Sequence, residues 1–398
     1  MVLLKRRTMI DHNMKPFNIQ ELLSTAKQRT GLSDFGAPDF VEGMDMFFAS
    51  LNEQGVISDD RWQHAHDRFI RLLVNRLYFA KDLAEHPEIL DENVDAPLVM
   101  ESLPRTGSTK LHRLLGASNA LNAVRMWQAH NFARIPGEAD GGQARRIAEC
   151  RAYEQWMYQT SPEIITGHPM FTDEPEEDNP VGEFTFRHTY LGGVFNVPRY
   201  SQWLAAADMK PTYDYFLQQI KYLQWQLQPK TAKPWLLKMP NHMGNEANLT
   251  RVFKKPRFVI THRDPVKCVT SIAIPVKTMR KLYSDEDTPS LLGAALIQLF
   301  SKMALDHLEW RKKNPDIPVL DIPYKEVNAD GLGVARKVFD FLGLPLDDDA
   351  MQRMRAWDEN NRRDKHPKNT YSAEEIGTTD DAIREAFEPY TERYSRYF

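Results

Sequence analysis

The sequence predicts an α/β fold with a parallel sheet, preceded by a helical lobe and elaborated by a helical insertion. Two observations support it. Short apolar runs typical of buried strands recur beyond residue 95, and segments with helical periodicity separate them. Strands that alternate with helices favour a parallel sheet with crossover helices. We expect a helical N-terminal lobe over residues 1–95 and an α/β domain over 96–398, with the helical insertion around 122–228.

The N-terminal lobe is predicted from amphipathic patterns between about residues 20 and 86. Apolar side chains recur at helical spacing in two groups, which are Val41, Met44, Met46, Phe47 and Leu51, and then Phe69, Leu72, Leu73 and Leu77. The lobe therefore reads as all-helical.

Four apolar runs are the expected strands of the α/β domain. They cover residues 96–103, 235–239, 256–261 and 319–322. A short helix should follow the first run and end at Gly116, and a later helix at 334–342 should end at Gly343. The insertion is rich in aromatic residues and contains an acidic loop at 173–180, and the polar stretch from about 360 to 379 is expected to be a loop.

Composition limits the class of protein. The 398 residues carry a net charge of −4, which argues against a general nucleic-acid binder. The two cysteines, Cys150 and Cys268, imply neither a disulfide framework nor a metal site. The N-terminus lacks the apolar core of a signal peptide, and the longest apolar stretch, around 291–300, is too short to span a bilayer. We therefore expect a cytoplasmic protein with no transmembrane segment, and the sequence leaves open whether it forms a homo-oligomer.

The first functional motif is Pro104-Arg-Thr-Gly-Ser-Thr109, directly after the first apolar run. A strand, a turn and a helix N-terminus direct backbone N–H groups and a positive dipole end at one point, which suits an anion. Arg105 adds charge, and Ser108 and Thr109 add hydroxyls. The Walker phosphate loop places its lysine before the hydroxyl residue, whereas here Lys110 follows, so this is not a Walker loop. Taken alone, the motif is equally compatible with an ordinary strand-to-helix turn.

The second motif is His262-Arg-Asp-Pro265, with Ser271 eight residues beyond Arg263. An arginine at a strand end and a hydroxyl two turns into the next helix can hold one phosphate together. Alone, Arg263 paired with Asp264 would be the simpler interpretation. Two anion sites in one α/β chain suggest a ligand with phosphate at both ends.

Together the motifs resemble the two signatures of the sulfotransferases that use 3′-phosphoadenosine 5′-phosphosulfate (PAPS), in a bacterial-type branch of that family. The resemblance extends over most of the chain, through residues 30–36, Pro175-Glu-Glu-Asp178, Leu237-Lys-Met-Pro-Asn-His242, and His366 to Ser372. It implies the P-loop-like sulfotransferase topology. It further implies that the 5′-phosphosulfate is bound by Arg105, Thr106, Gly107, Ser108 and Thr109, the 3′-phosphate by Arg263 and Ser271, and the adenine region by Tyr371.

The implied reaction moves a sulfuryl group to a hydroxyl, or less readily an amine, of a small-molecule or lipid-like acceptor. Arg105, in the loop, is the expected stabiliser of charge on the leaving oxygen. Lys238, at the end of another expected strand, can reach the same crevice, although a surface lysine is an equal alternative. This scheme requires no metal.

The general base is not identified by the sequence. Relatives often continue after the first motif with Trp-Glu, whereas this chain reads Trp127-Gln128, and an amide cannot act as a base. His168 and Glu177 are the preferred candidates, ahead of His130 and Asp178.

Two other functions stay open at this point. A nucleotide-dependent kinase would fit the same architecture, but the order of the Walker lysine argues against it. A non-catalytic module that binds adenosine bisphosphate is kept open by Gln128.

Overall fold

The computed structural model describes residues 15–138, 143–227, 233–286, 289–361 and 372–398. Its centre is a parallel five-stranded sheet of order β2-β3-β1-β4-β5. The strands are β1 (Leu98–Glu101), β2 (Asn122–Ala123), β3 (Trp235–Lys238), β4 (Arg257–His262) and β5 (Val319–Pro323). The predicted α/β fold with a parallel sheet is confirmed, and the two-residue β2 is the strand that the apolar runs did not reveal.

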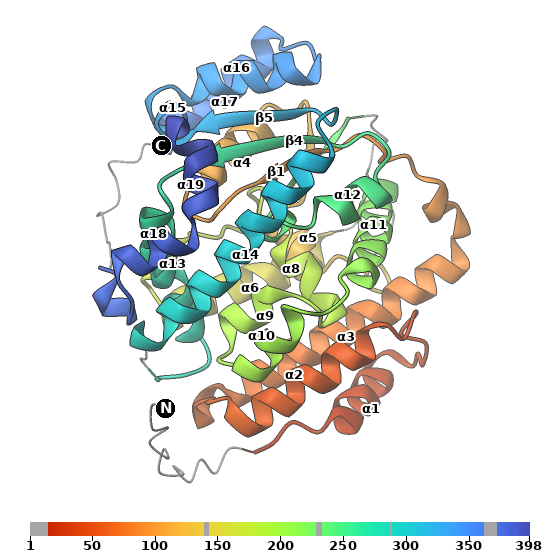
Figure 1. Cartoon of the computed structure of the whole chain (residues 1–398). Coiled ribbons are helices and arrows are strands. Elements are labelled where there is room, and N and C mark those ends of the chain that lie inside the picture. Colours follow the sequence, from red (N-terminus) through yellow and green to blue (C-terminus); the bar gives the residue numbers. More distant parts are fainter. Residues whose placement is uncertain (1–14, 139–142, 228–232, 287–288, 362–371) are drawn as a thin grey trace.

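Alternating side chains of the strands serve the two faces of the sheet, as the pleat requires. Leu98 and Met100 pack in a buried cluster with α4 (Ser108–Ala117) and α16 (Gly331–Leu342). On the other face, Ile260 packs with α14 (Leu292–Lys313) and α19 (Glu388–Tyr394), and α14 crosses the front of the sheet in Figure 1. Burial on both faces explains why β1, β3 and most of β4 read as apolar runs.

The N-terminal helices form the layer farthest from β5, at the bottom of Figure 1. They are α1 (Ile19–Thr30), α2 (Phe40–Gln54) and α3 (Trp62–Glu85), within the range predicted to be helical. Their contacts are aromatic: Phe69 packs edge-on against Phe47 and Phe48, with ring centroids 5.5 and 4.9 Å away.

The insertion consists mostly of short helices. One of the loops between them returns to the sheet. The helices are α5 (Met126–His130), α6 (Ala144–Thr160), α7 (Ile164–Gly167), α8 (Asn179–Gly182), α9 (Thr189–Val194), α10 (Pro198–Leu204) and α11 (Lys210–Trp225). The loop between α7 and α8 packs on α4 through Pro175. A Cβ on Gly116 would lie 2.7 Å from the Pro175 ring, so this glycine permits the close approach. Gly116 does not end α4, which runs to Ala117.

The remaining helices come after β3, β4 and β5 in the chain. They are α12 (Glu246–Val252), α13 (Pro265–Arg280), α14, α15 (Tyr324–Ala329), α16, α17 (Asp348–Asn360), α18 (Asp380–Ala386) and α19. Helix α16 ends as predicted, at Gly343 in the left-handed conformation. Much of the segment predicted to be a loop, 362–371, lies outside the described residues.

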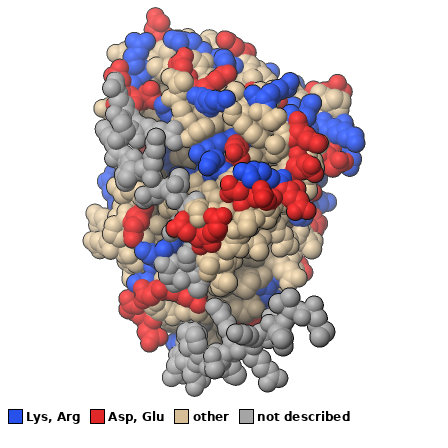
Figure 2. Space-filling view, turned by 60° about the vertical axis from the view of Figure 1, so that its left-hand side comes forward, with Lys and Arg blue, Asp and Glu red and all other residues tan. Residues whose placement is uncertain are grey.

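In the described part of the chain, no helix is both long and apolar enough to cross a bilayer. On the face shown in Figure 2, lysine and arginine lie interspersed with aspartate and glutamate.

Candidate functional site

The first motif forms a tight turn between β1 and α4. Arg105 and Gly107 both have positive φ, +67° and +80°. At Gly107 a side chain would be strained by this backbone conformation, and its Cβ would lie 3.2 Å from the Tyr324 ring. Helix α4 begins at Ser108, so its first backbone N–H groups lie next to the turn, where an anion is stabilised.

Thr106 holds this turn against the sheet. Its hydroxyl donates to Leu103 O at 3.0 Å and shares a 2.7 Å hydrogen bond with the hydroxyl of Thr261 in β4. The residue is fully buried, and its side chain points away from the ligand side of the turn. Its backbone N–H is therefore the group that Thr106 can offer to a ligand.

The second motif contacts the first directly. Arg263 donates from Nη1 to Arg105 O at 2.8 Å, and its guanidinium lies 4.4 Å from the centre of the Tyr324 ring. Asp264 does not pair with Arg263; its carboxylate accepts from Val266 N at 2.8 Å and caps α13. Tyr324 was missed by the sequence reasoning, although it directly follows β5 at the same edge of the sheet as the two motifs.

Ser271 lies in α13 on the wall beyond Arg263. Its hydroxyl donates to the carbonyls of Lys267 and Cys268, so it must rotate to donate to a phosphate. Burial raises the pKa of the Cys268 thiol to about 12, so this cysteine packs as a neutral group.

A cleft of about 1790 Å³ extends from these turns and is lined by residues of α9, α10, α13 and α14, among others. Nine of the predicted site residues line it: Arg105, Gly107, Ser108, Thr109, His168, Glu177, Lys238, Arg263 and Ser271. Thr106 lies behind the turn, and Tyr371 is outside the described residues.

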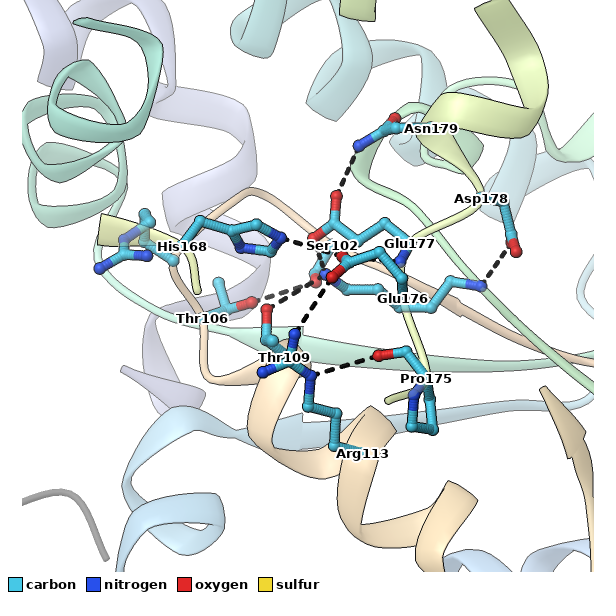
Figure 3. Close-up of polar contacts among 12 residues, drawn as sticks. Ser102, Thr106, Thr109, Arg113, His168, Pro175, Glu176, Glu177, Asp178 and Asn179 are labelled. Atoms are coloured by element: carbon cyan, nitrogen blue, oxygen red, sulfur yellow. Dashed lines mark hydrogen bonds and ion pairs between the residues drawn. The ribbon is translucent and has the colours of Figure 1, made fainter. Parts of the chain in front are cut away.

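Lys238 and Glu177 form an ion pair in this cleft. The Lys238 side chain is only 4% exposed, and its ammonium also donates to Thr109 Oγ1 at 3.3 Å. The other carboxylate oxygen of Glu177 accepts from Asn179 Nδ2 at 2.5 Å, as Figure 3 shows. The lysine predicted at a strand end is thus a buried cation beside the first motif.

Asp178 fastens the acidic loop to β3. Its Oδ2 accepts from the backbone N–H of Lys238 at 2.6 Å and lies 3.2 Å from His242 Nε2. The residue is fully buried, and burial raises the pKa of its carboxyl group. Asp178 does not line the cleft, so this candidate base anchors the loop to β3 instead of facing a substrate.

His168 is joined to a second carboxylate, Glu176. His168 Nε2 lies 3.0 Å from Glu176 Oε1, and Arg113 of α4 donates to Glu176 Oε2 at 3.1 Å (Figure 3). Burial would raise the pKa of Glu176, but the His168 and Arg113 charges and the hydrogen bonds to the carboxylate hold it well below its usual range. The sequence reasoning missed Glu176 and Arg113; Glu176 directly precedes a residue it did select.

Gln128 and His130 lie in α5 and do not line the cleft. The Gln128 side chain accepts from Arg125 N at 2.9 Å and caps the helix. The His130 ring stacks on Tyr153, with ring centroids 4.7 Å apart. Glutamine at position 128 therefore removes no base from the cleft.

One group in the described part of the chain has a donor set suited to a metal ion: Glu101, Glu246 and His307, whose ligand atoms all lie within 4.8 Å of one another. All three are buried, and none lines the cleft. Burial and the neighbouring Glu246 raise the pKa of Glu101, whereas hydrogen bonds to both carboxylates raise that of His307 despite its burial.

A family model described as "Sulfotransferase family" matches residues 97–348, which include β1 to β5 and both motifs. The chain belongs to the sulfotransferase family. No curated protein matches it. Its fold is similar to the crystal structure of the sulfotransferase STF9 from Mycobacterium avium, with 25% identity, coverage of 96% of this chain and 97% of the other, and a TM-score of 0.83. It is also similar in fold to the sulfotransferase STF1 from Mycobacterium tuberculosis H37Rv, with 24% identity, coverage of 94% and 99%, and a TM-score of 0.77.

Membership supports sulfuryl transfer as the activity, and the similarity in fold extends beyond the matched residues. The coverage of 96% reaches past the family match in both directions. This sulfotransferase therefore has the predicted fold class, an α/β core with helical lobes.

Proposed function

We propose that this sulfotransferase moves the sulfuryl group of PAPS to a hydroxyl, or less readily an amine, of a small-molecule or lipid-like acceptor. The observation that carries the proposal is the contact between the two motifs, in which Arg263 donates to Arg105 O at 2.8 Å. Because the two motifs lie side by side on one cleft, this contact supports a ligand with phosphate groups at both ends of one nucleoside.

The residues present fit that donor. The turn at Arg105 to Thr109 offers backbone N–H groups at the start of α4, together with one guanidinium and two hydroxyls, for the 5′ end. Arg263 and Ser271 lie on the adjoining wall for the 3′-phosphate. Tyr371 stays a proposal for the adenine region that rests on the family resemblance.

Two cations act on the leaving group in this proposal. When bound, PAPS supplies a sulfuryl group whose bond to the 5′-phosphate breaks during transfer. Arg105 in the turn and Lys238 beside Thr109 stabilise the negative charge left on the phosphate oxygen. His168 and Glu177 both line the cleft, and one of them removes the proton of the acceptor.

The acceptor is proposed to bind in the part of the cleft that α13 and α14 line. Apolar side chains dominate there, namely Ile274, Val276, Met279, Leu292, Leu296, Leu299, Phe300 and Met303. Such a wall suits an alcohol with a substantial apolar body.

Isothermal titration calorimetry tests the donor assignment, with adenosine 3′,5′-bisphosphate, AMP and ATP as ligands, in EDTA and in Mg²⁺. The proposal expects tight binding of the bisphosphate in EDTA and much weaker binding of AMP. Preference for ATP in Mg²⁺ would favour a kinase, and absence of bisphosphate binding would refute the proposed donor.

A further inference from the structure

We propose that Glu176 is a positioning residue that orients His168 as the general base of this sulfotransferase. The inference rests on the proposed function and chooses between the two candidate bases that line the cleft. Glu176 does not itself touch the acceptor in this proposal; it acts through the imidazole.

The geometry gives the two ring nitrogens of His168 different tasks. Nε2 lies 3.0 Å from Glu176 Oε1. Because an ionised carboxylate only accepts hydrogen bonds, Nε2 must carry a proton, and Nδ1 of the neutral ring is left with the lone pair. Nδ1 has no hydrogen-bond partner among the described residues, and the His168 side chain lines the cleft and is 21% exposed.

Glu176 is itself held firmly. It is 2% exposed and accepts from Arg113 Nη2 at 3.1 Å, while Oε1 also accepts from the backbone N–H of Glu177 at 2.8 Å. Arg113 is fixed in turn by donating to Pro169 O at 2.7 Å. Arg113 and the backbone N–H of Glu177 favour the ionised form of Glu176, in which the carboxylate can only accept from Nε2 of His168.

His168 also lies beside the first motif. Arg105 donates from Nη1 to the carbonyl of Gly167, the residue before His168, at 2.6 Å. The proposed base is therefore tied to the same turn that holds the leaving end of the donor, and the acceptor oxygen can approach between them.

Glu177 is engaged differently. One of its carboxylate oxygens accepts from Lys238 and the other from Asn179, as drawn in Figure 3. Both carboxylate oxygens of Glu177 therefore already accept from donors of the protein. We assign Glu177 as the counter-ion that positions Lys238.

The step balances without any further reactant. The acceptor oxygen forms a bond to sulfur as the bond from sulfur to the bridging phosphate oxygen breaks. The acceptor proton passes to Nδ1 of His168, and the electron pair of the broken bond stays on the bisphosphate, beside Arg105 and Lys238.

The tautomer of His168 tests this arrangement without any turnover. Long-range ¹H–¹⁵N spectra of histidine-labelled protein at pH 8, assigned with H168N, should show the neutral Nε2–H tautomer. The Nδ1–H tautomer would overturn the proposal, because Nδ1 would then have no lone pair. A doubly protonated ring would also overturn it, because such a ring cannot accept a proton.

Kinetics test the link between the two residues. We expect H168N to lower kcat by about 10²- to 10⁴-fold and E176Q by at least about 10-fold, with donor KM nearly unchanged in both. The double variant should lose no more than H168N alone, since Glu176 acts through His168. E176D, which keeps the carboxylate, should recover part of the loss, and D173N in the same loop, where Asp173 is exposed, is the matched control that keeps wild-type activity.

Losses that multiply in the double variant would refute a positioning role for Glu176. If the wild type transfers sulfuryl groups while His168 carries the Nδ1–H tautomer, this inference fails alone. If the wild type transfers none but shows the Nε2–H tautomer, the proposed function fails while the His168–Glu176 arrangement stands.

Discussion

Replacing Arg263 by alanine should weaken bisphosphate binding far more than AMP binding. A charge-assisted hydrogen bond to a phosphate contributes about 1.5–3 kcal/mol, equivalent to about 13- to 160-fold in Kd. AMP lacks the 3′-phosphate, so its affinity should change only through the lost support of the Arg105 carbonyl, by about 0.5–1.5 kcal/mol.

Isothermal titration calorimetry of wild type, R263A and R263K with both nucleotides measures this difference. R263K keeps a positive charge but loses the planar group stacked on Tyr324, so it should fall between the other two. Equal losses for the bisphosphate and AMP would mean that Arg263 supports the first motif without binding the 3′-phosphate. Unchanged binding of both would refute any role at the site.

Three further predictions follow from the same contacts. G107A should lower stability by about 1–2 kcal/mol and weaken bisphosphate binding, because a side chain is strained at φ +80°. Urea unfolding measures the stability and calorimetry measures the binding. Wild-type values in both would contradict the described turn. K238M should lower stability by about 3–5 kcal/mol, because it leaves the Glu177 carboxylate without its cation. The double variant K238M/E177Q should restore stability but not turnover. Recovered turnover would show that Lys238 is only structural. His112 of α4 and His242 are buried, and burial, together with the Lys238 charge near His112, lowers the pKa values of both to about 3. The unfolded chain therefore binds more protons below pH 6.5, and each histidine costs about 2 kcal/mol of stability at pH 5. H112N and H242N should lose correspondingly less stability than wild type between pH 7.5 and 5, and identical pH profiles would contradict this.

The strands were predictable because buried parallel strands are apolar on both faces. β1 and β4 lie within the predicted runs or one residue beyond them, whereas β2 has two residues and no pattern to detect. Gly116 shows a different limit. As a residue type it signals a helix end, but here it admits Pro175 from a loop 59 positions later in the chain. Close approaches between distant segments leave no local signal.

The site was predictable where a motif fixed the backbone. It was not predictable where the role of a residue depends on the direction of its side chain. Thr106 lies inside the first motif, yet its hydroxyl faces β4 because of the turn geometry around Arg105. Glu176 and Glu177 are neighbours in sequence, but one pairs with His168 and Arg113 and the other with Lys238. Arg113 comes from α4, His168 follows α7 and Lys238 ends β3, so the sequence alone could not separate the two carboxylates.

Turnover with ³⁵S-labelled PAPS tests the central claim most directly. The purified protein would be incubated with a panel of apolar alcohols, sugars and amines in EDTA, and transfer of label to acceptor would be measured together with bisphosphate release. We predict labelled product that requires an acceptor, forms without metal and is strongly reduced in R105A. Bisphosphate binding without transfer to any acceptor in the panel would contradict the account and favour a non-catalytic nucleotide-binding module.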